Sequence, residues 1–285
     1  MPGSSSRPSR KLACACALAI GGLDPGGGAG LAADLRAFEA AGAFGCAAAA
    51  VLTVQSTAGL RTVRALAARE VVAQATEVLR HQRVRAVKVG ALGSEANVRA
   101  VARLLARHAQ VPLVVDTPMA ATRGRARLLT ARAVAALRDE LLPRATVVTV
   151  NTDEAGVLTG ERVRTVGEAH DAALALARLG PMAVVVKGGH LTASDATATD
   201  VLVVGGEVVE LRARRIPGSA VHGTGCTFAS LVAGRLAVRT ATRVKSETVV
   251  DAVQWAKRVH HAALERALDV GGTMRVLVFP PLERS

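Results

Sequence analysis

Short apolar runs alternate along the chain with longer segments in which apolar residues recur every three or four positions. The runs predict buried strands over residues 12–21, 47–54, 86–90, 111–116, 145–150 and 182–187. The periodic segments predict helices over residues 31–42, 68–82, 94–108, 131–142, 166–179, 224–238 and 247–268. Val-rich strands that alternate with helices are typical of a parallel sheet with helices on both faces, so we expect a doubly wound α/β fold.

One late segment departs from this alternation. Two apolar runs, residues 201–204 and 208–211, are split by Gly205 and Gly206. Paired glycines favour a tight turn between antiparallel strands, so we expect a β-hairpin here.

The length of 285 residues suits one large domain with a full core. We expect a single domain over residues 12–285, preceded by a disordered tail over residues 1–11, which are polar, basic and rich in Ser and Pro. The apolar run after Arg10 and Lys11 could instead mimic a secretory signal. No stretch reaches the roughly 18 apolar residues of a membrane span, so we expect no membrane partner.

The chain is strongly basic, with a formal net charge of +13. Such a charge is typical of proteins that bind nucleic acid. Here, however, the basic residues are scattered along predicted helices and loops, and 2% aromatic residues leave little surface on which bases could stack. We expect no nucleic-acid partner.

The four cysteines, Cys14, Cys16, Cys46 and Cys226, show no C-x-x-C spacing and have no paired histidines near them. Three of them lie in apolar runs, which favours reduced packing residues over disulfides or a zinc site. We therefore expect a cytoplasmic protein.

Prominent polar residues follow the predicted strands. They are Asp24, Gln55, Asp116, Asn151, Glu154 and Lys187. Ligands of a parallel α/β sheet bind outside the carboxyl ends of its strands, so these positions predict one binding site.

Two of these segments leave alternatives open. Residues 24–30 (DPGGGAG) fit neither the dinucleotide fingerprint nor the Walker loop, so a loop without a ligand is one alternative. Asn151 and Glu154 at the start of a helix are either a capping arrangement or a Mg²⁺ site.

A glycine-rich segment, His222-Gly223-Thr224-Gly225-Cys226, leads into an apolar helix. The first amides of a helix have no partner within the helix, and with glycines they can form a phosphate site. An ordinary turn before a core helix, with a buried structural cysteine, is the alternative.

Seven motifs, in order from about residue 17 to residue 270, resemble those of one enzyme family. They are AIGGLDPGGGAGLAADLRAFEAAGAFGC, TVQST, KVGALGS, VVDTPM, LLPRATVVTVNTDEAGVLTG, VVVKGGH and HGTGCTFAS. The chain resembles the ribokinase superfamily, and more closely the hydroxymethylpyrimidine and phosphomethylpyrimidine kinases of thiamin synthesis. The resemblance implies a ribokinase-like three-layer αβα sandwich with a mostly parallel central sheet and a small lid, often as a homodimer.

The resemblance also implies a reaction. A phosphoryl group of ATP, with Mg²⁺, would pass to the hydroxymethyl group of 4-amino-5-hydroxymethyl-2-methylpyrimidine, and the same site would phosphorylate the resulting monophosphate.

Roles for individual residues follow from the resemblance. Gly223, Thr224, Gly225 and Cys226 would form an anion hole for the transferred γ-phosphoryl. Cys226 would accept the alcohol proton, with its pKa depressed at the helix N-terminus. Lys187 would offset phosphate charge.

The metal and the substrate would have their own residues. Asn151 and Glu154 would hold Mg²⁺ through water, and Thr224 and Lys187 would also face the nucleotide. Gln55 would hydrogen-bond the aminopyrimidine edge. The rest of the substrate pocket would consist of Gly22, Asp34, Ala91 and Asp116.

Departures from the family pattern leave the substrate open. Gly26 replaces a serine, Ala91 replaces a methionine that would face the ring, and Gly218-Ser219-Ala220-Val221 replaces a more polar segment before His222. A pyridoxal-type vitamin kinase, which a pocket widened at Ala91 favours, is one alternative. A catalytically inactive pyrimidine-binding sensor, which the changed segment allows, is another.

Overall fold

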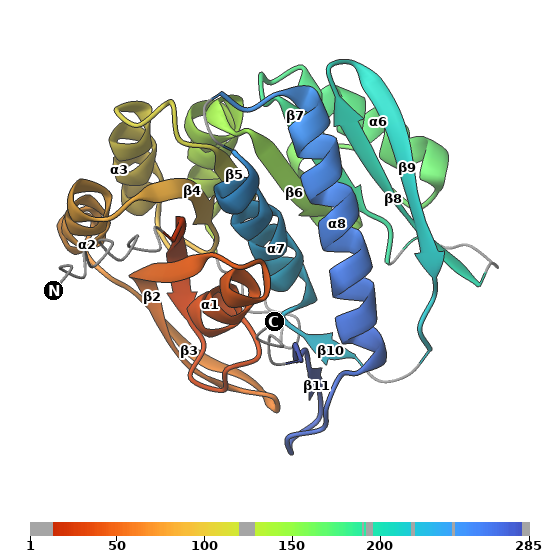
Figure 1. The fold of residues 1–285 in the computed structure, drawn as a ribbon, viewed down its shortest axis with the longest axis horizontal. Coiled ribbons are helices and arrows are strands. Elements are labelled where there is room, and N and C mark those ends of the chain that lie inside the picture. The colour runs from red at the N-terminus through yellow and green to blue at the C-terminus, as the bar shows by residue number, and fades with distance from the viewer. Residues whose placement is uncertain are drawn as a thin grey trace, which may run out of the picture.

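A nine-stranded sheet runs through the part of the chain that the structure describes (Figure 1). The computed structural model describes residues 14–119, 129–189, 191, 196–217, 220–240 and 243–280. The sheet order is β3-β2-β1-β4-β5-β6-β7-β8-β9. Its strands are β1 (Cys16–Leu23), β2 (Phe44–Ser56), β3 (Gly59–Ala65), β4 (Val84–Val89), β5 (Leu113–Asp116), β6 (Val147–Asn151), β7 (Ala183–Lys187), β8 (Thr197–Val204) and β9 (Glu207–Arg214).

Parallel pairing dominates the middle of this sheet. Strands β2, β1, β4, β5, β6 and β7 pair in parallel with their neighbours. At one edge β3 runs antiparallel to β2, and at the other β8 and β9 form the antiparallel hairpin that the sequence predicts. The parallel strands therefore present their carboxyl ends along one edge.

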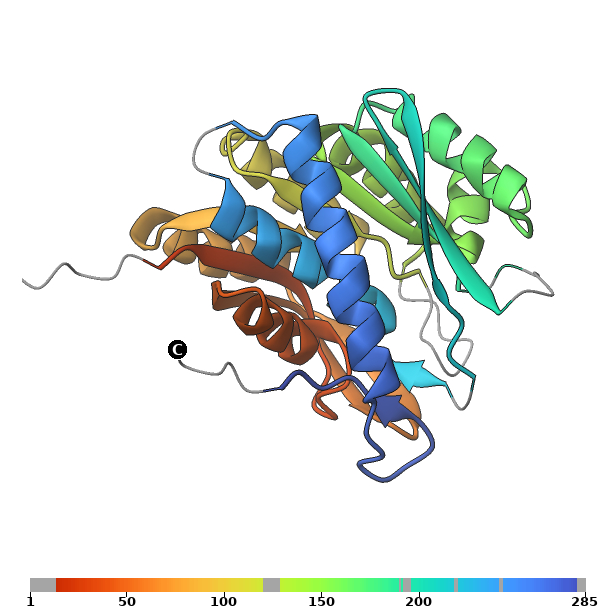
Figure 2. The ribbon, with the colours of Figure 1, turned by 45° about the vertical axis from the view of Figure 1, so that its right-hand side comes forward.

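Helices cover both faces of the sheet, which gives three layers (Figure 2). One face carries α1 (Gly30–Ala40), α7 (Thr224–Arg239) and α8 (Ser246–Glu265). The other carries α2 (Ala68–His81), α3 (Glu95–Ala106), α4 (Ala131–Ala136), α5 (Thr152–Thr159) and α6 (Val166–Ala177). The predicted three-layer αβα sandwich is confirmed.

Helix α7 is the central helix of its layer, and small side chains let its neighbour approach it closely. A Cβ atom at Gly234 of α7 would lie 2.7 Å from the Cβ of Ala41, at the end of α1. Buried alanines, valines and leucines fill the remaining space around α7. This packing fixes the position of the N-terminus of α7, where the HGTGC segment lies.

The predicted elements are present, with ends shifted by a few residues. The helix predicted over residues 131–142 is shorter, because α4 passes into a π-helical turn (Leu137–Leu141) and a 3-10 turn (Leu142–Arg144). Three strands were not predicted: β3 and the two-stranded parallel sheet of β10 (Val221–His222) and β11 (Arg275–Val276). The predicted tail over residues 1–11 lies outside the described residues, as do Gly218 and Ser219.

Within the described ranges, the helices include none whose length and apolar character would let it cross a membrane.

Candidate active site

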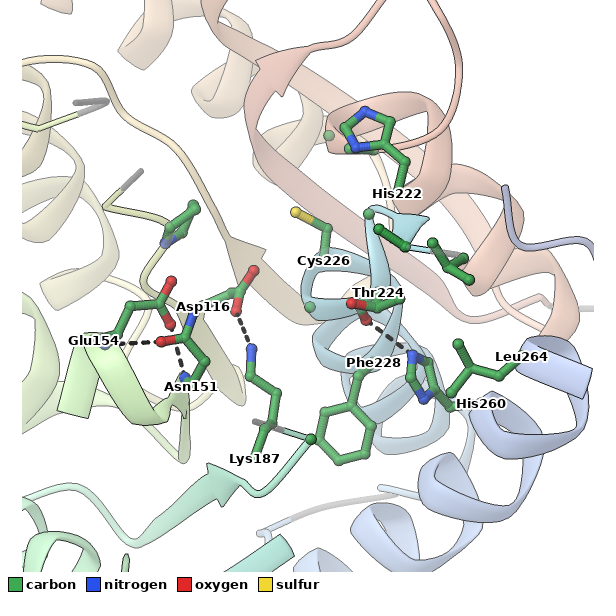
Figure 3. Close-up of a pocket in the computed structure, with 18 of the residues that line it drawn as sticks. Asp116, Asn151, Glu154, Lys187, His222, Thr224, Cys226, Phe228, His260 and Leu264 are labelled. Carbon is green, nitrogen blue, oxygen red and sulfur yellow. Dashed lines mark hydrogen bonds and ion pairs between the residues drawn. The ribbon is translucent and has the colours of Figure 1, made fainter. Parts of the chain in front are cut away.

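A cavity of about 880 Å³ opens at the carboxyl ends of the parallel strands. It is lined by strand-end residues of β1, β4, β5, β6 and β7 and by the loop that leads into α7. Figure 3 shows Asp116, Glu154, Lys187 and Cys226 around one open space. The strand-end residues that the sequence singles out therefore line one cavity.

The loop before α7 has a backbone that requires glycine. Gly223 caps the helix with φ of 74°, a left-handed conformation that glycine adopts at least cost. A Cβ atom at Gly223 would lie 2.0 Å from the carbonyl oxygen of Gly28, and one at Gly225 would lie 3.0 Å from Lys187 Nζ. The segment therefore leaves its helix N-terminal amides facing the cavity, where an anion can approach them.

The glycine-rich loop after β1 is held by Asp24. Its carboxylate accepts the backbone N–H of Gly26 at 2.8 Å and of Ala29 at 2.9 Å. Burial works to raise the pKa of the Asp24 carboxyl, but these bonds and His222 outweigh burial and hold the pKa below its usual value. Asp24 is thus an ionised residue that shapes the loop beside the HGTGC segment.

Lys187, at the end of β7, supplies positive charge to the cavity. Its Nζ lies 3.1 Å from Asp116 Oδ1 (Figure 3). Burial works to lower the pKa of Lys187, but Asp116 and Glu154 raise it above its usual value, so the ammonium is charged at neutral pH. Asp116, predicted to contact substrate, accepts hydrogen bonds from Lys187 and from Thr149.

Asn151 and Glu154 form a capping box at the start of α5. Glu154 N donates to Asn151 Oδ1 at 2.8 Å, and Asn151 N donates to Glu154 Oε2 at 2.9 Å. Burial raises the pKa of Glu154 to about 7, so the carboxyl is half-ionised at neutral pH. The capping alternative is confirmed.

The same two residues fit a magnesium ion held through water. Glu154 lines the cavity, and its Oε2 accepts the hydrogen bond of the capping box. Its Oε1 accepts no hydrogen bond from the described residues. Carboxylate oxygens and retained waters are what Mg²⁺ prefers. The described residues hold no group of three or more His, Cys, Asp or Glu arranged around a metal position.

Cys226 lines the cavity, but the predicted depression of its pKa is wrong. Burial raises the pKa of the thiol to about 12, with Lys88 acting in the opposite direction and Asp116 and Asp34 adding to the increase. The loss of water around the sulfur is the largest contribution to this increase. Cys226 is therefore a neutral thiol in the ligand-free protein.

Asp34 does not line the cavity, which corrects the prediction that it shapes the substrate pocket. It is fully buried, and its carboxylate accepts hydrogen bonds from Lys88 and from Ser230. Lys88, which the sequence reasoning did not select, reaches the cavity instead. Burial works to lower the pKa of Lys88, but Asp34 raises it above its usual value, so Asp34 acts on the cavity through this charge.

The end of the cavity near β1 and β2 contains the other predicted substrate residues. Gly22, Gln55 and Ala91 all line it. A Cβ atom at Gly22 would lie 3.7 Å from the Cβ of Ala91, so these two small residues form neighbouring parts of the cavity wall. Gln55 is the amide at this end, and it contacts His222 at 3.0 Å.

A family model described as phosphomethylpyrimidine kinase matches residues 24–277. The chain belongs to this family. It is 41% identical to the hydroxymethylpyrimidine/phosphomethylpyrimidine kinase of Rhizobium meliloti (strain 1021), over 90% of this chain and 94% of that protein. The corresponding Streptomyces coelicolor enzyme is 39% identical over 90% of each chain.

Solved kinase structures share the fold. An ADP complex of Bacillus subtilis pyridoxal kinase gives a TM-score of 0.82 at 28% identity, covering 93% of this chain and 97% of that chain. Phosphomethylpyrimidine kinase from Clostridium difficile 630 gives 0.74 at 29% identity, covering 88% and 99%. The predicted ribokinase-like fold and kinase class are confirmed.

The opposite end of the cavity holds residues that sequence reasoning missed. His260 of α8 donates from Nε2 to the carbonyl oxygen of Thr224 at 3.0 Å (Figure 3), and burial lowers its pKa to about 3, so the ring is neutral. Asp200 accepts the backbone N–H of Gly188 and the ammonium of Lys257. These residues come from antiparallel β8 and from α8, where no strand-end rule applies.

Proposed function

We propose that this member of the family transfers the γ-phosphoryl group of ATP to 4-amino-5-hydroxymethyl-2-methylpyrimidine and then to its monophosphate. One observation carries the proposal: a single cavity contains the Gln55 amide at one end, and the HGTGC helix N-terminus with Lys187 beyond it. An amide suits an aminopyrimidine edge, and a helix N-terminus with a lysine suits phosphate. The names of the Rhizobium and Streptomyces relatives support the same substrate.

Charge stabilisation and positioning account for most of the catalysis in this proposal. The alcohol oxygen bonds to the γ-phosphorus while the bond to the β,γ-bridging oxygen breaks, and ADP takes the charge of the leaving group. Negative charge on the transferred group meets the amides of Gly223, Thr224, Gly225 and Cys226 and the ammonium of Lys187.

Cys226 has a positioning role in this proposal. A thiol with a pKa of about 12 holds too little thiolate to remove the alcohol proton before transfer. Its Sγ is instead a weak hydrogen-bond partner that orients the hydroxymethyl oxygen toward phosphorus. The alcohol proton then passes late, after the bond to the bridging oxygen has largely broken, to an oxygen of the transferred phosphoryl group, as suits a loose transition state.

Mg²⁺ would be held by Glu154 and Asn151 through water and would neutralise charge on the β- and γ-phosphates. Because the Glu154 carboxyl has a pKa of about 7, the approach of a cation favours its ionised form. Lys187 shares this task from β7, and its ion pair with Asp116 holds the ammonium in place.

A pyridoxal-type vitamin kinase is a second candidate. Ala91 leaves room in the cavity wall, and the chain shares its fold with Bacillus subtilis pyridoxal kinase. The inactive sensor is less well supported, because the Lys187 and HGTGC elements are complete; the changed residues Gly218 and Ser219 lie outside the described part of the chain.

The deciding experiment compares ATP consumption by the purified protein with hydroxymethylpyrimidine, its monophosphate and pyridoxal, each with Mg²⁺. Turnover on both pyrimidines supports the proposal. Turnover on pyridoxal alone supports the second candidate, and tight binding without turnover supports the sensor.

We further propose a cytoplasmic homodimer with one domain over residues 12–285. All four cysteines are free thiols, as suits a reducing compartment. Leu52 and Val54 of β2 are exposed and lie on the same face of the β2–β3 hairpin, where they form a small apolar surface that a second copy of the chain could cover. Light scattering after gel filtration should give twice 29.2 kDa, and Leu52→Glu with Val54→Glu should give the monomer.

A further inference from the structure

His222 lies between two polar side chains and contacts both through one nitrogen atom. Its Nε2 is 2.9 Å from Asp24 Oδ2 and 3.0 Å from Gln55 Nε2. His222 and Asp24 are both buried, whereas Gln55 is partly buried and lines the cavity. The order of contact is therefore Asp24, then His222, then Gln55, then the ligand.

The Nε2 atom must be a hydrogen-bond donor. Asp24 is ionised, and an ionised carboxylate can only accept. A lone pair on Nε2 would face that carboxylate at 2.9 Å and repel it. Nε2 therefore carries a proton, whether or not Nδ1 also carries one.

This assignment decides which way the Gln55 amide points. An amide NH₂ group only donates, so it cannot pair with an Nε2–H group. A half-turn of the amide exchanges its nitrogen and oxygen. In the turned orientation the oxygen faces His222 and shares the single Nε2–H hydrogen with Asp24 in a three-centre hydrogen bond. The NH₂ group is then left for whatever occupies the cavity.

We propose that His222 is a positioning residue that fixes the orientation of the Gln55 amide and thereby selects ligands that present a hydrogen-bond acceptor to it. This inference rests on the proposed function, because it takes the ligand to be a pyrimidine. A ring nitrogen of an aminopyrimidine is such an acceptor. A 4-oxo pyrimidine presents a ring N–H instead, and two donors would face each other.

The fold prevents the His222 ring from moving out of this position. A Cβ atom at Gly28 would lie 2.4 Å from His222 Cδ2, so the ring lies directly on the glycine loop. The backbone of His222 belongs to β10 and pairs with Val276 of β11. Nδ1 is buried and has no hydrogen-bond partner among the described residues, so Nε2 is the nitrogen that links the ring to its neighbours.

Three substitutions separate the donor from the size of the side chain. His222→Gln can place an amide NH₂ near the position of Nε2 and should preserve the orientation. His222→Asn places its NH₂ nearer the position of Nδ1, so it retains polarity without the donor. His222→Leu removes the donor and retains much of the volume.

Each protein is tested with three pyrimidines that carry the same 5-hydroxymethyl and 2-methyl groups. They are the 4-amino compound, the 4-unsubstituted compound, which keeps the ring acceptor but lacks the amine, and the 4-oxo compound. Dissociation constants are measured by calorimetry without ATP, and kcat and KM are measured with ATP.

The wild type should bind the 4-amino and 4-unsubstituted compounds within about tenfold of each other, and the 4-oxo compound about 100-fold more weakly. In His222→Leu and His222→Asn the amide can turn, so the preference over the 4-oxo compound should fall about tenfold, mainly in KM. His222→Gln should retain the wild-type preference over the 4-oxo compound. A purely structural role would lower activity on every substrate without changing this preference.

Three results would overturn the inference. One is a wild-type protein that binds the 4-oxo compound more tightly than the 4-unsubstituted compound, because the amide oxygen would then face the ligand. The second is an unchanged preference in His222→Leu and His222→Asn, which would leave the proposed function intact. The third is a wild type that binds none of the three pyrimidines, which would remove the proposed function as well.

Discussion

Lys88 Nζ lies 2.9 and 3.0 Å from the two carboxylate oxygens of Asp34, and both side chains are buried. Ser230 donates a further hydrogen bond to Asp34 at 2.7 Å. The pair joins β4 to α1 behind the cavity, and the Lys88 charge reaches the thiol of Cys226. This ion pair therefore connects the stability of the core to the electrostatics of the site.

Lys88→Met should destabilise the protein by about 3–5 kcal/mol, because the Asp34 carboxylate would be left buried without its partner. The double variant Lys88→Met/Asp34→Leu should recover most of that loss. The exposed pair of Arg99 with Glu95 is the matched control, and Arg99→Met should leave the stability nearly unchanged. Urea unfolding measures the free energy of unfolding of all three variants. Equal losses of stability in Lys88→Met and in the double variant would contradict the prediction.

Magnesium affinity should depend on pH through Glu154. The pKa of this carboxyl is raised by burial from 4.5 to about 7, and Mg²⁺ needs the ionised form. One proton therefore competes with the metal, and the apparent affinity should fall about tenfold per pH unit below pH 7 and level off above it. In Glu154→Gln the affinity should be weaker and independent of pH. Titrating the kinase rate with Mg²⁺ over a range of about 1.5 pH units on either side of pH 7 provides the measurement.

The stability of the metal-free protein should change in the opposite sense. A carboxyl whose folded pKa is raised contributes its stability below pH 4.5, and that contribution is lost as pH rises toward 7. Glu154→Gln, which keeps an acceptor for the capping box, should remove this decline. Thermal unfolding in the presence of a chelator would show it, and an identical pH profile in both proteins would contradict the raised pKa.

Cys226 should react slowly with alkylating reagents although it lines the cavity. With a pKa of about 12, only about one thiol in 10⁵ is a thiolate at pH 7. Exposed Cys14 is an internal control and should be labelled first by iodoacetamide. Mass spectrometry of the labelled peptides gives the order of labelling, and equal labelling of the two cysteines would show an activated thiol.

Cys226→Ser should retain kcat within about tenfold, since loss of a general base would lower kcat by about 10²–10⁴-fold.

Gly223→Ala should abolish activity. Its φ of 74° disfavours a side chain by about 1–2 kcal/mol, and the added Cβ would also lie 2.0 Å from the Gly28 oxygen. Gly160 has a similar φ of 84° but open space around its Cβ position, so Gly160→Ala should cost only the backbone part. Comparing kcat and the urea midpoints of the two variants separates the backbone strain at positive φ, which both share, from the clash with the Gly28 oxygen, which only Gly223→Ala has. Full activity in Gly223→Ala would contradict the loop geometry.

The sequence predicts the site residues that follow simple local rules. Gln55, Asn151 and Lys187 were found because each ends a strand of a parallel sheet, where ligands bind. Lys88 was not found, because it stands inside an apolar strand and its burial depends on Asp34, 54 residues away. Strand β3 was missed for a related reason: its residues are half-buried or exposed, so they show no apolar run.

The error over Cys226 has a physical origin of the same kind. A helix N-terminus lowers a thiol pKa, and this rule can be applied from the sequence. Tertiary packing sets the extent of burial and brings the charges of Asp34 and Asp116 to act on the thiol. A local rule therefore gave the wrong sign where a long-range contribution was larger.

Strand β11 comes after helix α8, yet it pairs with β10, which leads directly into the HGTGC loop. During synthesis on the ribosome, the sheet and helix α8 can therefore emerge before residues 275–276 are available to hold that loop. A nascent chain would have its core before it has a working phosphate site. The loop before α7 thus depends on a strand that is synthesised after every strand of the central sheet.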